Sequence, residues 1–278
     1  MMTYTHSGLA DDVARAIAED VGDGDLTAML IPESTDINAR VICRDAATIA
    51  GQPWFDETFR QIDSGVTVDW AVAEGAAVAE NTLLCQIHGS ARSVLTAERT
   101  ALNFLQTLSA TATATARCVA QLAGTSTRLL DTRKTIPGLR MAQKYAVAIG
   151  GGSNHRIGLH DAVLIKENHI MAAGSISAAV KAARDTGYGN LLEVEVETLP
   201  QLEEAIGAGA QRALLDNFSN DELLAAVEMA KGTIELEASG GFELDDLAAV
   251  AATGVDFISV GAITKHIHAV DLSMRFQP

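Results

Sequence analysis

The sequence has little of several residue types, and each shortage narrows the kind of protein it can be. Its 278 residues include three cysteines, which are far apart and form no Cys-x-x-Cys pair, so we expect buried free thiols and no disulfide framework. Five prolines and no low-complexity tract argue against disordered arms. No apolar run is long enough to cross a bilayer, and the first twenty residues lack the charged-then-apolar pattern of a secretory leader. We therefore expect a globular, cytoplasmic protein with no membrane partner.

Basic residues are also scarce, with 20 Lys and Arg against 36 Asp and Glu and a net charge of -16. Such an acidic sequence lacks the broad cationic face that nucleic acid requires, so no nucleic-acid partner is expected. The stretch 131–169 departs from this balance, because it holds six basic and three acidic residues together with three histidines. An acidic chain that gathers its cations in one region is expected to present them to a small anion. A solvated helix surface of ordinary composition is the alternative.

The placement of these cations favours an anion site. Arg133 and Lys134 directly follow the apolar pair at 129–130, and Lys166 directly follows the apolar run at 162–165. A cation at the exit of a buried strand is costly unless a partner needs it there. These three cations are therefore candidates for contact with an anionic ligand.

The first 121 residues are typical of a domain with antiparallel strands and helices. Apolar residues at near-helical spacing predict a helix over 8–20, and a long Ala/Thr/Leu-rich segment predicts another over 91–121. A further helix is expected near 54–62. Short alternating apolar runs, separated by Gly or Asn, predict antiparallel strands at 39–43, 66–70 and 83–87.

After residue 124, apolar runs alternate with helical segments. This alternation is typical of successive βα units, which build a parallel sheet or barrel. Six clear units favour an incomplete (β/α) barrel over a full eight-fold one. The predicted strands are 128–131, 162–166, 191–197, 213–216, 233–239 and 257–261, and the predicted helices are 176–186, 199–208, 221–230 and 244–252.

The predicted strands end in residues that can perform chemistry. In a barrel the carboxyl ends of the strands converge on one face, where active sites are built. One polar strand end could be chance, but six in succession form a pattern. The residues concerned are Asp131, Arg133, Lys134, Lys166, Glu195, Glu197, Asp216, Asn217, Glu237, Ser239 and Gly261.

The strand predicted at 191–197 carries three carboxylates. Glu193, Glu195 and Glu197 alternate with apolar residues, so a period of two puts all three on one side. An isolated strand with this pattern would simply have one face in water. In a parallel barrel both faces are covered, so inward carboxylates must pair with cations, or with substrate hydroxyls and a metal. Arg133, Arg156 and Lys166 are the available cations.

The phrase Ser239-Gly240-Gly241 lies between a predicted strand and a predicted helix. Exposed backbone N–H groups at such a place suit a phosphate. A plain turn explains the phrase equally well.

Seven phrases, taken together and in order, resemble the quinolinate phosphoribosyltransferase family, also called carboxylating nicotinate-nucleotide pyrophosphorylases. The resemblance covers essentially the whole chain, and an early Glu-Asp-x-Gly-x-Gly-Asp-x-Thr phrase at 19–27 fits as well. The phrases are Thr-Ala-Glu-Arg-Thr-Ala-Leu-Asn at 96–103, Asp-Thr-Arg-Lys-Thr at 131–135, Asn-His-Arg at 154–156, Leu-Ile-Lys-Glu-Asn-His at 164–169, Glu-Val-Glu-Val-Glu at 193–197, Leu-Asp-Asn at 215–217 and Ser-Val-Gly-Ala at 259–262.

The resemblance implies a pentosyltransferase of NAD biosynthesis. Its substrates would be quinolinate and phosphoribosyl pyrophosphate, with Mg²⁺ as cofactor, and its products nicotinate mononucleotide, pyrophosphate and CO2. It also implies an N-terminal α/β sandwich over 1–105, to which a tail at 265–278 returns, and a (β/α) barrel-like catalytic domain over 106–264. Family members form dimers whose sites use both subunits, so a homodimer is expected.

Carried over by motif, the resemblance assigns roles to individual residues. Lys134, Lys166, Glu195 and Asp216 would be catalytic, and Arg99 would enter the site from the partner subunit. Glu195 and Asp216 would also hold Mg²⁺ through water. The substrate-binding set would be Arg99, Thr132, Arg133, Lys134, His155, Arg156, Lys166, Glu195, Asp216, Ser239, Gly240, Gly241, Gly261 and Ala262, with quinolinate near Arg133, His155, Arg156 and Lys166, and the 5′-phosphate near Ser239, Gly240, Gly241 and Gly261.

Three positions depart from the family pattern, and other functions stay open. Ala110 stands where Gly is common, Ala238 where Ser is common, and Thr-Lys-His at 264–266 replaces a frequent Thr-His-Ser. A related transferase could act on another pyridine or azole acid. A Schiff-base aldolase could use Lys166 as its nucleophile. A non-catalytic anion-binding protein is less well supported, because gripping a dicarboxylate would not require Glu195 or Asp216.

Overall fold

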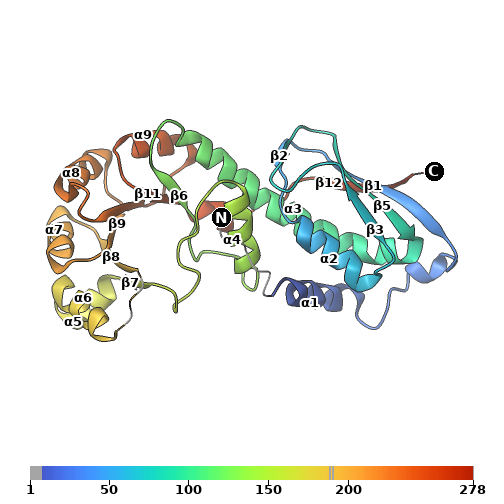
Figure 1. The fold of residues 1–278 in the computed structure, drawn as a ribbon, viewed down its shortest axis with the longest axis horizontal. Helices are drawn as coiled ribbons and strands as arrows, with labels where there is room; N and C mark the ends of the chain where they lie inside the picture. Colours follow the sequence, from blue (N-terminus) through green and yellow to red (C-terminus); the bar gives the residue numbers. More distant parts are fainter. Residues whose placement is uncertain (1–7, 188, 190, 278) are drawn as a thin grey trace. The chain divides into compact units, whose positions relative to one another are not determined.

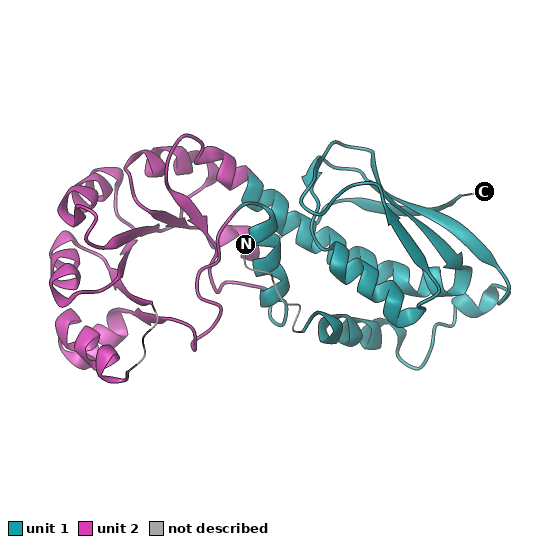
Figure 2. Ribbon diagram, in the orientation of Figure 1, with its two compact units in different colours: residues 1–116, 136–151, 266–278 teal, residues 117–135, 152–265 magenta. Residues whose placement is uncertain are grey.

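The computed structural model describes residues 8–187, 189 and 191–277 of the chain (Figure 1). Its contacts divide the chain into two compact units, which Figure 2 draws in different colours. The first comprises residues 1–116, 136–151 and 266–278, and the second comprises residues 117–135 and 152–265. The sequence predicts no secretory leader over the first twenty residues, and residues 1–7 of that segment lie outside the part of the chain that the structure describes.

The first unit is built on a four-stranded antiparallel sheet in the order β12-β1-β5-β3. Side chains alternate along β1, where Ala39, Val41 and Cys43 are buried and Arg40 is exposed. The three strands predicted in this part of the sequence are confirmed. The sheet consists of β1 (Asp36–Cys43), β3 (Thr67–Trp70), β5 (Thr82–Ser90) and β12 (Leu272–Gln277), and β2 (Ala47–Thr48) and β4 (Ala77–Val78) form a separate short pair.

Helices α2 and α3 cover one face of this sheet (Figure 1). Phe55 and Phe59 of α2 are fully buried in a core that includes Val41 and Ile87 of the strands. A second core forms around Trp54, where α1, α2, α3 and α4 pack together. The helices predicted at 8–20, 54–62 and 91–121 are confirmed. The helical elements of this unit are α1 (Leu9–Val21), η1 (Ala28–Leu30, a 3-10 turn), α2 (Gln52–Ile62), α3 (Ala91–Gln121, whose end belongs to the second unit) and α4 (Arg140–Ile149).

The second unit is built on a six-stranded parallel sheet in the order β6-β11-β10-β9-β8-β7. Helices α5 to α9 lie along its outer side (Figure 1). The expected α/β class and the incomplete barrel are confirmed, and each strand overlaps its predicted run. The strands are β6 (Arg128–Leu130), β7 (Val163–Ile165), β8 (Leu192–Val196), β9 (Arg212–Asp216), β10 (Glu235–Ser239) and β11 (Phe257–Ser259).

The helices between these strands follow the predicted alternation. Polar side chains cap them, as Ser175 does for α6 and Thr198 does for α7 by accepting a backbone N–H. The helical elements are α5 (Glu167–Ala173), α6 (Ile176–Asp185), α7 (Leu199–Ala208), α8 (Asn220–Ala230), η2 (Leu244–Asp246, a 3-10 turn), α9 (Leu247–Ala252) and α10 (Ala262–Lys265).

The register of the parallel strands aligns their carboxyl ends. Leu130, Ser259, Ser239 and Asp216 are successive partners across β6, β11, β10 and β9. An isolated bridge joins Leu130 to Ser153, which brings the segment 153–156 beside the end of β6. Residues that follow the strands therefore meet at one edge of the sheet.

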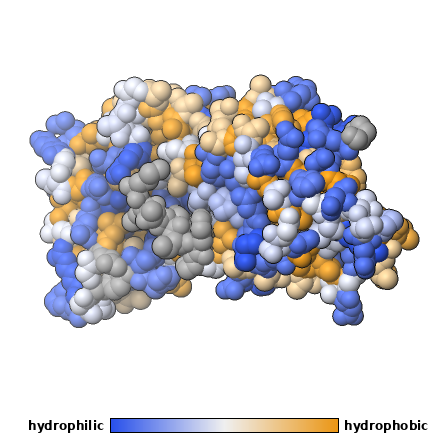
Figure 3. All heavy atoms as spheres, turned by 45° about the vertical axis from the view of Figure 1, so that its right-hand side comes forward, coloured by the Kyte–Doolittle hydropathy of each residue, from blue (hydrophilic) through white to orange (hydrophobic). Residues whose placement is uncertain are grey.

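The three cysteines are free and buried, as the sequence predicts. Among the residues that the structure describes, no helix combines the length and the apolar composition needed to span a membrane. The face drawn in Figure 3 carries hydrophobic side chains interspersed with hydrophilic ones.

Candidate active site

The carboxyl edge of the six-stranded sheet holds nearly all the candidate residues. Each follows a strand or occupies its last positions, so the strand order fixes which of them are neighbours. Arg99 is the exception, because it lies on α3 in the first unit. The residues at the edge are Thr132, Arg133 and Lys134 after β6, His155 and Arg156 after the Ser153 bridge, Lys166 after β7, Glu195 on β8, Asp216 on β9, Ser239, Gly240 and Gly241 at the end of β10, and Gly261 and Ala262 after β11.

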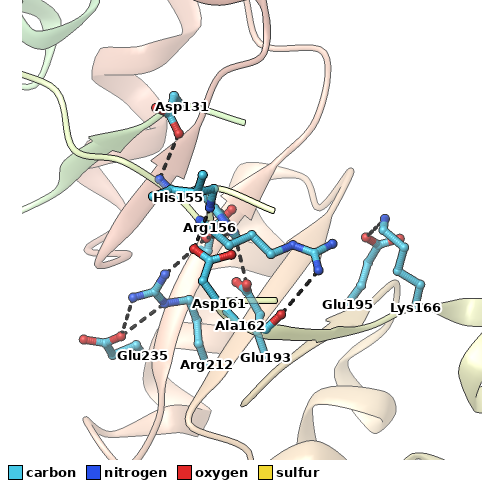
Figure 4. Close-up of polar contacts among 12 residues, drawn as sticks. Asp131, His155, Arg156, Asp161, Ala162, Lys166, Glu193, Glu195, Arg212 and Glu235 are labelled. Carbon is cyan, nitrogen blue, oxygen red and sulfur yellow. Dashed lines mark hydrogen bonds and ion pairs between the residues drawn. The ribbon is translucent and has the colours of Figure 1, made fainter. Parts of the chain in front are cut away.

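Lys166 and Glu195 form an ion pair between neighbouring strands (Figure 4). Ile165 is the register partner of Val194, so the next residue along each strand, Lys166 and Glu195, stand opposite each other. The Lys166 side chain is 43% exposed and that of Glu195 is 13% exposed, so the pair is open to a ligand on the lysine side. The expected pairing of an inward carboxylate with Lys166 is confirmed for Glu195.

Two guanidinium groups lie close enough to affect each other. Burial lowers the pKa of Arg156, and the positive charge of Arg133 lowers it further. Arg156 Nη1 donates to the Ala162 carbonyl at 3.4 Å (Figure 4). Arg133 Nε is buried and has no hydrogen-bond partner among the described residues. Two adjacent cations, one with a buried unpaired donor, make this end of the sheet suitable for an anion.

Glu193 points into the barrel and contacts a different cation from those predicted. His155 Nε2 lies 3.0 Å from Glu193 Oε2 and 3.3 Å from Glu237 Oε2. All three side chains are buried. The expectation that Arg133, Arg156 or Lys166 would pair with Glu193 is therefore wrong, because the ring of His155 occupies that position. Glu197 is exposed after the end of β8, so it is not an inward carboxylate as predicted.

The three buried groups change each other's proton affinity. Burial works against a charged His155, but Glu193 and Glu237 outweigh it and raise the pKa of His155 to about 9. Burial also raises the pKa of Glu193 to about 7, an effect that His155 opposes and Glu237 reinforces. The Arg156 backbone N–H donates to His155 Nδ1 at 2.7 Å, which places the proton of the neutral ring on Nε2. A proton on Nε2 faces the carboxylates in the neutral and the charged ring alike.

Asp131, at the end of β6, fixes the segment that carries His155. Its Oδ1 accepts the His155 backbone N–H at 2.8 Å, and its Oδ2 accepts the side-chain amide of Asn154 at 2.7 Å. The Asp131 backbone N–H donates to the Ser153 carbonyl at 3.1 Å. Asp131 is fully buried, so these bonds hold the segment to the sheet without competition from water.

Two glycines at the edge allow neighbouring side chains to pack closely. A Cβ on Gly261 would lie 3.0 Å from Lys134 Cδ and 3.3 Å from Thr132 Oγ1. A Cβ on Gly240 would lie 3.2 Å from Asn217 Oδ1. The loop after β6 is also tied to α10, because Thr264 Oγ1 donates to the Lys134 carbonyl at 2.9 Å. These contacts bring the ends of β6, β9, β10 and β11 close together.

The region after Ser239-Gly240-Gly241 differs from its prediction. The sequence predicts a single helix over 244–252, but the 3-10 turn η2 covers Leu244–Asp246 and α9 begins at Leu247. Three acidic residues at 243–246 stabilise the tight turn, where Glu243 and Asp246 cap each other's backbone. Any phosphate cradle here must therefore use the turn directly after β10.

Sequence reasoning missed the role of Arg212. Its Nη2 pairs with Glu235 Oε2 at 2.7 Å, and its Nη1 lies 3.6 Å from Glu237 Oε2. Its guanidinium lies 4.0 Å from the centre of the Phe257 ring. Arg212 begins β9, and attention to the carboxyl ends passes over residues at strand starts. The sequence does contain a signal for this pairing. Arg212 directly precedes one predicted strand, and Glu235 and Glu237 lie on the next.

The family resemblance implies that Glu195 and Asp216 hold Mg²⁺ through water. Among the described residues, one set of three metal-capable side chains converges, namely His155, Glu193 and Glu237. Glu195 and Asp216 are outside it and so do not form a closed cage. Carboxylate oxygens at an open strand edge nevertheless fit Mg²⁺, which keeps several waters and binds substrate phosphates. The donors present therefore fit a metal held mainly by water and substrate.

Comparison with known families covers almost the entire chain. Residues 25–109 match the quinolinate phosphoribosyl transferase N-terminal domain, and residues 111–275 match the C-terminal domain of the same enzymes. The chain belongs to the quinolinate phosphoribosyltransferase family. The resemblance found in its sequence motifs is thereby confirmed.

Curated relatives and solved structures of this family match the chain over most of its length. The probable carboxylating nicotinate-nucleotide pyrophosphorylase of Bacillus subtilis is 40% identical over 92% of this chain and 89% of its own. The Mycobacterium leprae enzyme of that name is 39% identical, with 95% of each chain covered. The structure of the nicotinate-nucleotide pyrophosphorylase from Francisella tularensis is 48% identical, with a TM-score of 0.94, and covers 97% of this chain and 96% of its own.

Proposed function

We propose that this chain transfers a phosphoribosyl group to quinolinate and removes one carboxylate as CO2. The products are nicotinate mononucleotide, pyrophosphate and CO2, which places the enzyme in NAD biosynthesis. Membership of the quinolinate phosphoribosyltransferase family supports this reaction. The observation that carries it is local: Arg156 lies close enough to Arg133 and to Glu195 of the Lys166–Glu195 pair for their charges to act on it, at one edge of a chain with net charge -16.

The adjacent cations match the charge of quinolinate, a pyridine ring with two carboxylates. Each guanidinium can hold a carboxylate with two parallel hydrogen bonds, and a lysine ammonium adds a point charge. Arg133 follows β6, Lys166 follows β7 and Arg156 lies in the segment after the Ser153 bridge, and Lys134 is next to Arg133 in the chain. Arg133 Nε is buried and unpaired among the described residues, so a bound carboxylate would relieve an unfavourable state.

Glu195 and Asp216 are the proposed contacts for the ribose and for the metal. They end neighbouring strands, and Asp216 Oδ2 accepts the side-chain amide of Asn217 at 2.9 Å. Carboxylates there can accept hydrogen bonds from the ribose hydroxyls and, through water, hold Mg²⁺. The metal, when bound, would neutralise negative charge on the pyrophosphate that departs.

The 5′-phosphate is proposed to lie against Ser239, Gly240, Gly241, Gly261 and Ala262. These residues follow β10 and β11, which are adjacent in the sheet. Glycines let a phosphate approach the backbone N–H groups, and the Ser239 hydroxyl supplies one more donor. Lys134 packs against Gly261 and brings a cation to the same place.

The proposed residues explain how the reaction is accelerated. Departure of pyrophosphate leaves positive charge on the ribose, and Glu195 and Asp216 stabilise that charge while the cations orient the ring nitrogen for attack. The new N-ribosyl bond makes the ring a pyridinium. Loss of CO2 from the adjacent carbon then leaves an electron pair beside the positive nitrogen, and a proton replaces the carboxylate. Lys134 and Lys166 lie where they can stabilise the carboxylates before release.

We also propose a homodimer in which Arg99 of the partner subunit completes each site. Arg99 is exposed on α3, where a cation can serve a neighbouring molecule. One turn earlier, Thr96 Oγ1 donates to Asp25 Oδ2 at 2.9 Å, which fixes the start of the adjoining segment. That segment carries Leu26, Met29 and Leu30, exposed by 81%, 68% and 83%. Exposed apolar groups beside a candidate site residue support a surface that a second copy covers.

The cytoplasm is the proposed location. Cys43, Cys85 and Cys118 are free thiols, which suits a reducing compartment.

A labelled-substrate assay tests the proposed function. Quinolinate carrying ¹⁴C in the 2-carboxylate is incubated with phosphoribosyl pyrophosphate and Mg²⁺, and CO2, pyrophosphate and mononucleotide are measured together. Equimolar release of all three is expected, with none when nicotinate replaces quinolinate. Lys166→Met should abolish release, whereas Lys181→Met, which removes a lysine from an exposed ion pair with Asp185, should not. CO2 formed without phosphoribosyl pyrophosphate, or equal use of nicotinate, would refute the assignment.

The alternatives are less well supported. A Schiff-base aldolase needs an unpaired lysine in an apolar pocket, and Lys166 is instead paired with Glu195. A transferase for a pyridine or azole acid with a single carboxylate, such as nicotinate, would need fewer cations. The nicotinate arm of the assay distinguishes that activity directly.

A further inference from the structure

Two buried carboxylates below the strand ends have no part in the proposed chemistry. Glu193 on β8 and Glu237 on β10 are 0% exposed. None of their four oxygens has a hydrogen bond of good geometry within the described residues. Burying two such groups is unfavourable unless cations compensate them. The groups that compensate these two negative charges therefore indicate the role of the pair.

One compensating group is Arg212 and the other is His155. Arg212 reaches only Glu237, at 3.6 Å, and is shared with Glu235. His155 contacts both carboxylates through the same atom, Nε2, at 3.0 and 3.3 Å. The pair therefore holds the imidazole from two strands of the sheet at once, and the ring has no freedom to turn.

The same three side chains could in principle hold a metal ion, since their ligand atoms lie within 4.8 Å of one another. The contacts of the ring argue against that use. A metal on Nε2 would need a proton on Nδ1, but Nδ1 accepts the Arg156 N–H at 2.7 Å. Arg212 also places a cation next to the set. The geometry therefore points to a proton on Nε2, donated to the carboxylates.

The contact at His155 Nδ1 connects the buried carboxylates to Arg156, a residue of the candidate active site. Both ring nitrogens of His155 are engaged inside the protein, one by the carboxylates and one by the backbone of Arg156. Asp131 Oδ1 fixes the backbone N–H of His155 itself, and Asp161 holds the backbone of Ile157 at 2.6 Å. A change in the ring position would thus shift the backbone from which the Arg156 guanidinium extends (Figure 4).

We infer that Glu193 and Glu237 are positioning residues, which act through His155 to set the place of the Arg156 guanidinium. The inference rests on the proposed function, because Arg156 is taken there to grip a quinolinate carboxylate. His155 then contributes to quinolinate binding through its neighbour and not by direct contact.

Glu237→Gln tests the inference, because it keeps the shape of the side chain and removes its charge. Glu235→Gln is the matched control, since it lies on the same strand and also contacts Arg212 but not His155. In Glu237→Gln the KM for quinolinate should rise about tenfold or more, while the KM for phosphoribosyl pyrophosphate stays within about twofold. Glu235→Gln should leave both constants within about twofold. Equal changes in both KM values, or no change in either, would overturn the inference.

A spectroscopic arm separates this inference from the proposed function. In ¹⁵N-labelled protein above pH 9, where His155 is neutral, its ring nitrogens, assigned by comparison with His155→Asn, should report a protonated Nε2 and a hydrogen-bonded, unprotonated Nδ1. That pattern should be lost or shifted in Glu237→Gln and kept in Glu235→Gln. A wild-type ring with a free Nδ1 would overturn the inference even if quinolinate is the substrate. If Glu237→Gln does not fold, Glu193→Gln takes its place, and the wild-type spectrum still decides.

Discussion

Replacing Arg133 with alanine should separate activity from stability. A guanidinium that holds a carboxylate makes two charge-assisted hydrogen bonds, each contributing about 1.5–3 kcal/mol. Removing one partner of such a buried pair costs about 2–5 kcal/mol. If Arg133 binds quinolinate in the transition state, kcat/KM for quinolinate should fall by about 30-fold to about 5,000-fold.

The same substitution should not destabilise the unliganded protein. Arg133 Nε is buried without a partner among the described residues, and such a donor costs about 1–3 kcal/mol. Arg133→Ala should therefore unfold at the same or a higher urea concentration than the wild type. Arg212→Ala offers the contrast, because it breaks a pair with Glu235 and a contact with Glu237 and should lower stability by about 3–5 kcal/mol.

Steady-state kinetics with quinolinate varied, together with urea unfolding, measures both effects. Arg184→Ala is the activity control, because Arg184 is exposed and bonds to the Gly209 carbonyl, away from the strand ends. It should leave kcat/KM within about twofold. Arg133→Lys should have an intermediate kcat/KM, since lysine keeps the positive charge but cannot make the two parallel hydrogen bonds of a guanidinium. A kcat/KM for Arg133→Ala within about threefold of wild type would refute the assigned role.

Three further predictions concern the dimer, the buried proton and the core. Arg99→Ala and Lys166→Ala should each be inactive alone. When the two variants are mixed and allowed to exchange subunits, about a quarter of wild-type activity should return, because half the dimers are mixed and each of these has one intact site. No recovery, although mass spectrometry detects mixed dimers, would exclude shared sites. Because the pKa of His155 rises from 6.5 to about 9 on folding, its contribution of roughly 3 kcal/mol should be fully present below pH 6.5 and lost as pH rises through 9; urea midpoints that do not fall over this range would contradict the proton uptake. Phe55→Ala should lower the unfolding free energy by about 3–5 kcal/mol, because Phe55 is fully buried. Phe276 is 42% exposed, so Phe276→Ala should lower the unfolding free energy by less than about 1 kcal/mol. Equal losses in the two variants would show that the core is placed wrongly.

Most of the fold could be predicted from the periodicity of apolar residues in the sequence. Apolar runs with a period of two marked β1, and runs alternating with helical segments marked all six strands of the parallel sheet. Helices α4 and α5 were not predicted, and the 3-10 turn η2 before α9 follows from local capping by Glu243 and Asp246. Such caps compete with a regular helix start and are hard to weigh from composition alone.

The site was predictable as far as it depends on position along one strand. Lys166 and Glu195 end neighbouring strands, so their pairing follows once the strand order is assumed. The His155 contacts with Glu193 and Glu237 do not follow in the same way. They join a loop to two strands that are separated in the sheet by β9, and only the curvature of the sheet brings them together.

Packing of distant segments was likewise outside the reach of the sequence. Residues 136–151 lie between β6 and β7 in the chain but pack in the first unit, where Ala142 and Ala146 of α4 join the core around Trp54. Their amphipathic pattern predicts that one face is buried but cannot identify the partner.

The most direct test of the central claim is a crystal structure of the protein with quinolinate bound. Both carboxylates should lie within hydrogen-bond distance of the cations at the strand ends, with the guanidinium groups of Arg133 and Arg156 on the ligand and the ring nitrogen facing the side of Glu195 and Asp216. Quinolinate bound away from these side chains, or bound while Arg133 and Arg156 point elsewhere, would contradict the account.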